Sequence, residues 1–378
     1  MAMADEHRVT PLELFFDLVF VLAITQVTGL LADDATWKGL ARGMLVLGAL
    51  WWSWSAYAWL TNTVDADEGG TRLAMLSAMA AMLIVALAVP GVFNQNALEF
   101  GIAYAFVRAM HLVLYVRAAG DAGLRSATLR MTATSAPAVV LIIAASFFDG
   151  VAQGAIWAAA LLLDYGGIAV GRMRGWALLH PHHFAERYGL IVLIALGESI
   201  VAIGIGASTV TELETAEIAA ALLGAVLVSA LWWTYFDTTA IVAERRLATL
   251  EGVDRVRLAR DSYSYLHLPL IAGVVLIALG IKKTLAETGA PLAEVPAVAL
   301  CGGVALYLLT HVARRWRGLR TFGRNRFIAG LVALALIPVA REVDALVTLA
   351  LLAVLTSALV AYEALHFREG RARVRARA

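Results

Sequence analysis

The stretch Leu12–Ala32, with the sequence LELFFDLVFVLAITQVTGLLA, decides the fold class of this chain. It is a nearly continuous apolar run, and a helix needs about 20 such residues to cross a lipid bilayer. The run is longer than a signal-peptide core and has no small-residue cleavage site before Asp33, so we expect it to be retained as a span. Similar runs recur throughout the 378 residues, of which 61% are hydrophobic and 16% charged. The sequence therefore predicts an all-α polytopic membrane protein.

Hydropathy predicts about twelve membrane spans that are separated by short polar loops. The eleventh is the shortest, because Pro338 and Arg341 limit it. Cys301 is the only cysteine, so an internal disulfide is excluded. The predicted spans are 12–32, 40–61, 72–93, 98–117, 128–148, 151–171, 185–208, 216–238, 259–281, 293–313, 326–341 and 345–366.

The lysine and arginine residues fall mainly on one side of these spans. If the N-terminus is cytoplasmic, most of the 30 basic residues lie in cytoplasmic loops and in the C-terminal tail. The opposite side then holds only Lys38, Arg42, Lys282, Lys283 and Arg341. Positive loops stay in the cytoplasm, and an odd number of spans would invert every later loop. The asymmetry therefore favours an even number of spans, with both termini cytoplasmic.

A double tryptophan occurs in each half of the chain and indicates an internal repeat. The second span contains ALWWSW at 49–54, and the eighth contains ALWWTY at 230–235. The runs that begin at Glu13 and Glu186 match more loosely; chance similarity among apolar helices is the alternative. We predict two parallel six-helix repeats related by an axis along the membrane normal. Their ranges are 1–175 for the N-terminal repeat and 176–378 for the C-terminal repeat with its basic cytoplasmic tail.

Arg108 is the clearest ionisable residue within a predicted span, because it lies near the middle of the fourth. Such a group costs several kcal/mol in the membrane unless it is paired or hydrated. Tyr104 and His111 share its helix face, at the i, i+4 and i+7 spacing. This face is expected to look into the bundle. Glu198 reaches a similar depth in the seventh span and is the partner that we expect for Arg108.

Three acids lie nearer the cytoplasmic ends of their spans. Glu13 and Asp17 share one face of the first span, and Asp164 lies on the sixth. We expect them to form an inner acidic ring, with Arg130, Glu186 and Arg187 as neighbouring charges. A purely structural role, in which buried charges fix the register of packed helices, is the alternative for all of these groups.

Histidine and tryptophan side chains are further candidates for a substrate or ion pathway. His267, one turn after Tyr263, could complete a protonatable centre with His111, although a packing role is commoner. Trp51 and Trp52 lie near the middle of the second span, where they could wall a pocket and stack on a cation. Packing between helices is the reading that we favour for both tryptophans.

Several motifs are absent, and their absence narrows the function. There is no phosphate-binding Gly-rich loop, no His-Glu-x-x-His and no Gly-x-Ser-x-Gly, so we expect no ATP-driven pump, no catalytic residues and no enzyme. No cofactor and no metal site is expected. The loop HPHH at 180–183 could bind a metal, but such a loop is more commonly a solvated connector, which is the interpretation that we favour. Basic residues lie in loops without interleaved aromatic residues, which argues against nucleic acid as a partner.

Four sequence motifs resemble those of the bacterial low temperature requirement protein A family. They are RVTPLELFFDLVFV at 8–21, ALWW at 49–52 through WLTN at 59–62, HFAERYGL at 183–190 and ALGESI at 195–200. The motifs extend from the first predicted span to the eighth. The resemblance implies a protein that is integral to the bacterial cytoplasmic (inner) membrane and is connected with growth at low temperature. It implies no particular substrate or reaction.

Charges within the membrane and a repeated architecture together predict a secondary transporter or channel-like protein for an unknown small solute or ion. A non-transporting membrane stress or assembly factor that supports growth in the cold is the first alternative. An intramembrane lipid-modifying enzyme comes last. The expected partners are the lipid bilayer, with anionic lipid at the basic loops and tail, and a second copy of the chain is left open.

Overall fold

The structure is a computed structural model that describes residues 8–64, 66, 68–171, 173, 175–208 and 214–376. This part of the chain is almost entirely helical, with one isolated β-bridge between Pro291 and Asp344. The helices are α1 Pro11–Asp33, α2 Trp37–Thr61, α3 Gly69–Ala88, η1 Val89–Gly91, α4 Ala97–Ala118, α5 Ala122–Ala145, α6 Gly150–Val170, α7 Pro181–Ser208, α8 Thr215–Phe236, α9 Thr239–Thr249, α10 Gly252–Leu258, the π-helix η2 Ala259–Tyr265, α11 His267–Ala286, α12 Glu294–Leu319, α13 Arg324–Val339, α14 Ala345–His366 and α15 Arg368–Arg375.

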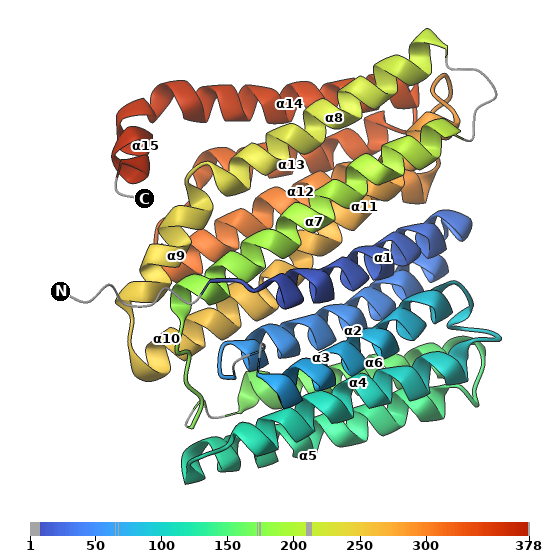
Figure 1. Cartoon of the computed structure of the whole chain (residues 1–378). Helices are drawn as coiled ribbons and strands as arrows, with labels where there is room; N and C mark the ends of the chain where they lie inside the picture. The colour runs from blue at the N-terminus through green and yellow to red at the C-terminus, as the bar shows by residue number, and fades with distance from the viewer. Residues whose placement is uncertain are drawn as a thin grey trace. The chain divides into compact units, whose positions relative to one another are not determined.

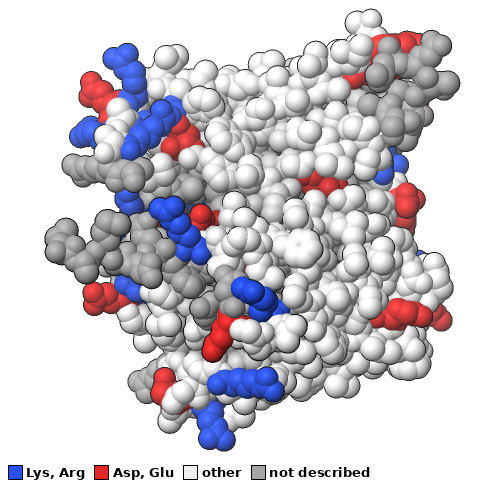
Figure 2. Space-filling model, viewed as in Figure 1, with Lys and Arg blue, Asp and Glu red and all other residues white. Residues whose placement is uncertain are grey.

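Ten helical segments in the described part of the chain are long and apolar enough to cross a membrane. Two helices that were expected to span it fall outside this set. One is α2, whose 25 residues are rich in tryptophan, glycine and serine, and the other is α13, which has 16 residues. Large apolar side chains such as Val151, Leu222 and Val354 are well exposed, and Figure 2 shows mostly uncharged helix flanks. The protein is therefore a multi-pass helical membrane protein.

The chain forms two compact units that alternate along the sequence. Unit 1 comprises Met1–Leu30, Ala41–Arg187 and Leu250–Arg260. Unit 2 comprises Leu31–Leu40, Tyr188–Thr249 and Asp261–Ala378. Four of the five boundaries fall within α1, α2, α7 and η2, and the fifth lies between α9 and α10.

Unit 1 is built around the helices α1 to α6, which lie alongside one another (Figure 1). Consecutive helices pack together from α3 to α6. α5 begins at a side-chain cap, in which Asp121 accepts a hydrogen bond from the Leu124 backbone N–H at 2.8 Å. Tyr165 on α6 donates a hydrogen bond to the Gly48 carbonyl on α2 at 2.8 Å, and this bond ties the sixth helix to the second.

Unit 2 has its most closely packed pair in α11 and α12, whose candidate spans are also the most buried of the ten. A Cβ atom added at Gly273 would lie 2.8 Å from the Gly303 carbonyl oxygen, so the backbones touch at this crossing. Small residues allow such close approach between membrane helices. The contact brings the start of α11, with His267, against the second half of α12.

Within unit 2, the basic tail helix α15 is bound to the end of α8 through Asp237. Arg371 Nε lies 2.7 Å from an Asp237 carboxylate oxygen, and Arg375 pairs with the other oxygen. The Arg371 guanidinium also lies over the Trp233 ring, 5.8 Å from its centroid. These tail arginines therefore have partners within the protein as well as any that they find in lipid.

Candidate functional site

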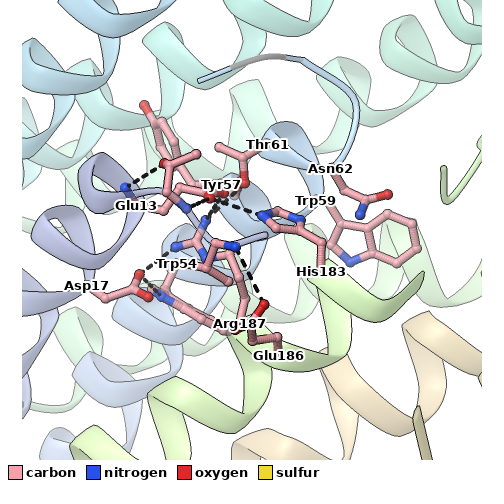
Figure 3. A network of polar contacts seen from close by, with 12 residues as sticks. Glu13, Asp17, Trp54, Tyr57, Trp59, Thr61, Asn62, His183, Glu186 and Arg187 are labelled. Carbon is pink, nitrogen blue, oxygen red and sulfur yellow. Dashed lines mark hydrogen bonds and ion pairs between the residues drawn. The ribbon is translucent and has the colours of Figure 1, made fainter. Parts of the chain in front are cut away.

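A buried network of charged side chains joins the first two turns of α1 and α7 in unit 1. Arg187 donates from Nη1 to Glu13 Oε1 at 3.1 Å and from Nη2 to Asp17 Oδ1 at 2.5 Å. His183 Nε2 lies 3.0 Å from Glu13 Oε2. All four side chains are almost completely buried. Figure 3 shows His183 and Arg187 pointing from α7 toward the two acids on α1.

The sequence places these groups by starting both helices with proline, a residue well suited to the first helical position. The two acids of α1 follow Pro11 at the same spacing as His183 and Arg187 follow Pro181. Each pair therefore lies on one face of its helix. Thr10 completes a capping box, because its N–H donates to Glu13 Oε2 at 2.9 Å and its hydroxyl accepts from the Glu13 N–H at 3.3 Å.

Helix α2 supports the network from one side. Trp54 Nε1 donates to Asp17 Oδ1 at 2.8 Å, and Thr61 Oγ1 accepts from Arg187 Nη1 at 2.9 Å. Asn62 fixes the segment that leads into α7. Its side-chain amide N–H donates a hydrogen bond to the His180 carbonyl at 2.7 Å, and its amide oxygen accepts one from a neighbouring backbone N–H. The end of α2 thus positions the first turn of α7.

The network has more acid than base when His183 is neutral. Two carboxylates share the single guanidinium of Arg187, and His183 adds a second positive charge only when it is protonated. Asp17 Oδ2 is buried and has no hydrogen-bond partner among the described residues. A buried carboxylate with an unused oxygen can accept a proton or a small cation. No group of three or more His, Cys, Asp or Glu residues that could hold a metal ion is found in the described chain.

A second buried ion pair in unit 1 joins α4, α5 and α6. Arg108 Nη2 lies 2.9 Å from Asp164 Oδ2 and donates to Ser135 Oγ at 3.0 Å, while Ser135 donates to Asp164 Oδ1 at 2.6 Å. The prediction that Glu198 pairs with Arg108 is therefore wrong. The prediction that Asp164 belongs to an acidic ring with Glu13 and Asp17 is also wrong, because Asp164 pairs with Arg108. The choice of a partner by depth in the membrane failed because a difference of a few residues along a helix corresponds to only about 6 Å. An arginine side chain can reach over that distance.

The other charged residues of the expected ring lie outside the buried network. Glu186 is exposed and accepts a hydrogen bond from the Val9 N–H at 3.4 Å. Arg130 is exposed and donates to Ser126 at 2.7 Å. Glu198 is buried in unit 2. Among the charges predicted to surround Glu13 and Asp17, Arg187 is the one that binds both acids.

The aromatic candidates of unit 1 are buried among other rings. Trp51 lies 5.1 Å from Trp54, and Trp52 stacks on Tyr165 at 4.0 Å between ring centroids. Tyr104 stacks on Phe100, which places it among the packed rings near Arg108. His111 packs against the rings of Tyr57 and Tyr115, at 5.6 and 5.0 Å. These contacts favour packing as the role of both tryptophans.

Unit 2 contains a different buried cluster, built from histidine and tyrosine. His267 Nδ1 lies 2.9 Å from the Ser262 carbonyl oxygen and must donate to it, so its Nε2 accepts the Tyr235 hydroxyl at 3.0 Å in the neutral ring. The ring stacks on Tyr263 at 5.2 Å. Ser262 and Tyr263 belong to the π-helix η2, and π-helical segments are frequent at functional sites.

Arg314 of α12 is the cation of this second cluster. Its guanidinium lies 5.2 Å from the centroid of the Tyr235 ring and 5.7 Å from that of Tyr263. The side chain is buried, and no carboxylate pairs with it in the described part of the chain. The surroundings of this arginine are therefore aromatic, whereas those of Arg108 and Arg187 are acidic.

Several of these residues did not stand out in the sequence. The expectation of a solvated loop at 180–183 is wrong for His183, because α7 begins at Pro181 and turns that histidine inward. The i, i+4 spacing of His183 and Arg187 could have indicated a basic face that complements the acidic face of α1. Trp54 and Arg314 carry no comparable signal, since their partners come from distant segments.

Comparisons with known proteins place the chain among bacterial membrane proteins. The sequence model of one family, described as bacterial low temperature requirement A protein, matches residues 8–361. A Rhizobium meliloti (strain 1021) protein described as uncharacterized is 30% identical over 319 residues, which cover 80% of this chain and 76% of that protein. No solved structure matches. The matched range includes every residue of the buried clusters.

Proposed function

Because the chain belongs to the bacterial low temperature requirement A family of multi-pass membrane proteins, we propose that it is a secondary transporter or channel-like protein rather than an enzyme. The observation that carries the proposal is the surplus of acid in the network of Glu13, Asp17, His183 and Arg187. Ionisable groups within spans commonly mark ion pathways. In this proposal the network binds the transported or coupling ion.

The charge of the network selects the kind of ion. With His183 neutral, two carboxylates and one guanidinium leave one negative charge in a site of low dielectric constant. One proton or one small monovalent cation neutralises that charge, whereas a divalent cation would leave an excess positive charge. Asp17 Oδ2 is the oxygen that has no donor among the described residues, so it is the proposed point of binding.

The proposal includes twelve spans in two parallel repeats, 1–175 and 176–378, in the bacterial inner membrane with both termini cytoplasmic. Every predicted span overlaps a helix of the structure, which supports this count. Trp54 and Tyr235 occupy the same place in the two tryptophan motifs. Each donates a hydrogen bond within a buried cluster, to Asp17 and to His267 respectively. The same hydrogen-bonding role at equivalent positions of the two motifs supports an internal repeat.

Anionic lipid is the proposed partner at the basic helix ends. A pocket of about 760 Å³ opens beside the end of α6 in unit 1. It is lined by Arg257 and Arg260 together with apolar residues that include Val170 and Val253. Basic pockets of this kind between membrane helices bind the head groups of anionic lipids. A second copy of the chain is a further proposed partner, in a homo-oligomer.

Ion flux into proteoliposomes tests the function. Purified protein is reconstituted, and uptake of protons, Na⁺ and K⁺ is followed separately with ion-selective dyes. We expect the wild type to conduct one of these ions and Asp17→Asn to lower the rate at least tenfold. Glu186→Gln, which changes an exposed acid beside the network, is the matched control and should keep the wild-type rate. Absence of flux of all three ions in the wild type would count against the proposal.

The second candidate function is a non-transporting stress or assembly factor that supports growth in the cold. The Arg108–Asp164 pair favours it, because this pair, with Ser135, joins three helices as a structural clamp would. The two functions differ in cells. If the protein acts only as a scaffold, a strain that needs it for growth in the cold would grow as well with the Asp17→Asn variant as with the wild type.

A further inference from the structure

The cluster in unit 2 contains buried hydrogen-bond donors that have no acceptor. Arg314 is 5% exposed, and its Nε and Nη1 atoms have no hydrogen-bond partner among the described residues. His311, one turn earlier on the same face of α12, is 1% exposed, and neither of its ring nitrogens has a partner in the described chain. Unsatisfied buried groups of this kind are rare in folded proteins and call for an explanation.

The carboxylates of unit 2 that pair with arginine do so elsewhere. Glu363 binds Arg326 at 2.9 Å, Asp261 binds Arg317 at 2.8 Å, and Asp237 binds the tail helix. No ion pair joins any described acid to Arg314. The Arg314 guanidinium therefore has no ion-pair partner among the described residues, in a helix that the chain buries deeply.

The tyrosine rings do not replace a counterion. The faces of Tyr235 and Tyr263 attract the guanidinium, but this attraction is weaker than the cost of removing an arginine from water. Charges buried in proteins are as a rule paired. The two rings lie beside the guanidinium and leave its Nε and Nη1 donors without an acceptor among the described residues.

We propose that Arg314 and His311 form a binding site for a small monovalent oxyanion, such as nitrate, formate or another small carboxylate. The guanidinium recognises planar oxyanions through its fixed array of N–H donors, and His311 supplies a further donor from the adjacent turn. A single negative charge matches the single guanidinium, whereas a dianion such as sulfate would bring an uncompensated charge into the site. The inference concerns unit 2 alone and does not depend on ion transport through unit 1.

Anion-dependent thermal stability of the full-length protein in detergent tests this site. Unfolding is followed at constant ionic strength while chloride is replaced by nitrate, formate or sulfate. We expect nitrate and formate to raise the unfolding midpoint saturably in the wild type, and sulfate to produce no saturable rise. Arg314→Gln should weaken the apparent affinity for nitrate at least tenfold. Arg317→Gln is the matched control, because Arg317 lies on the same helix but pairs with Asp261.

A second variant keeps the test decisive if Arg314→Gln does not fold. His311→Asn alters the other donor without removing the cation, and we expect it to weaken nitrate binding about threefold to tenfold, which is the range for one lost hydrogen bond. A wild type without a saturable response to nitrate or formate would overturn the proposal. Equal responses of the wild type and of either Arg314→Gln or His311→Asn would also overturn it.

Discussion

The two units bury arginine in opposite surroundings. In unit 1, Arg187 binds two carboxylates and Arg108 binds one, with hydroxyl groups as additional acceptors. In unit 2, Arg314 lies against two tyrosine rings, without an ion-pair partner among the described acids. The Glu13–Asp17 network therefore has more acid than base when His183 is neutral, whereas the cluster around Arg314 holds a cation without an ion-pair partner among the described residues.

This difference teaches that a buried charge alone does not identify a role. A pair in which the charges balance, such as Arg108 with Asp164, can hold helices together without a further ion, although Arg108 Nε and Nη1 have no hydrogen-bond partner among the described residues. We propose that an unbalanced cluster binds an ion of the opposite sign, a cation at the Glu13–Asp17 network and an anion at Arg314. Three substitution experiments test how far the comparison extends.

The largest difference in the loss of stability is expected between the variants Arg187→Met and Arg314→Met. The first leaves two carboxylates buried without their cation, so it should lower the free energy of unfolding by about 3–5 kcal/mol. The second removes an unpaired cation and loses ring contacts of about 0.5–2 kcal/mol, which the relief of desolvation largely offsets. We expect it to change stability by about 1 kcal/mol or less. Unfolding by sodium dodecyl sulfate titration, without added nitrate, measures both values. Similar losses in the two variants would remove the proposed contrast.

The Arg108–Asp164 pair should behave as a closed structural unit. Asp164→Leu leaves Arg108 buried and unpaired, and we expect it to destabilise the protein by about 3 kcal/mol. Adding Arg108→Met should recover most of that loss, because the double variant has no buried charge left. A double-mutant cycle on the unfolding free energy measures the coupling. If the double variant were as unstable as the sum of both single variants, the pair would be no clamp.

The smallest contrast concerns the two donors of the tryptophan motifs. Trp54→Phe removes a hydrogen bond to the charged Asp17 and should cost about 1.5–3 kcal/mol, whereas Tyr235→Phe removes one to a neutral histidine and should cost about 0.5–1.5 kcal/mol. The same unfolding titration compares them. A larger loss for Tyr235→Phe would contradict this order and would indicate that the Tyr235 hydroxyl also bonds a charged group, for which Arg314 is the neighbour.

Much of the fold could be predicted from local sequence. Apolar runs of bilayer length predicted the membrane class, and the family motifs predicted a relationship that the match over residues 8–361 confirms. The acidic face of α1 could also be predicted, because Glu13 and Asp17 lie one turn apart. The count of twelve spans stays a prediction, since α2 and α13 are less apolar or shorter than the ten candidate spans.

The partners of the buried charges could not be predicted in the same way. Depth along a span suggested Glu198 for Arg108, yet Asp164 is the residue that the neighbouring helices bring within 2.9 Å. His183 was expected in solvent, because the sequence 180–183 does not reveal that α7 starts within it. Local spacing says which residues share a helix face, but it does not say which face a neighbouring helix presents.

The sequence by itself determined that this protein is a bundle of apolar helices that carries ionisable groups within the membrane. That follows from local physics, since the length of an apolar run and the spacing of residues along a helix need no knowledge of distant segments. Only the tertiary structure decided that Arg187 meets two acids while Arg314 meets tyrosine rings. Such pairing depends on how helices pack and how far side chains reach, and these are properties of the folded chain.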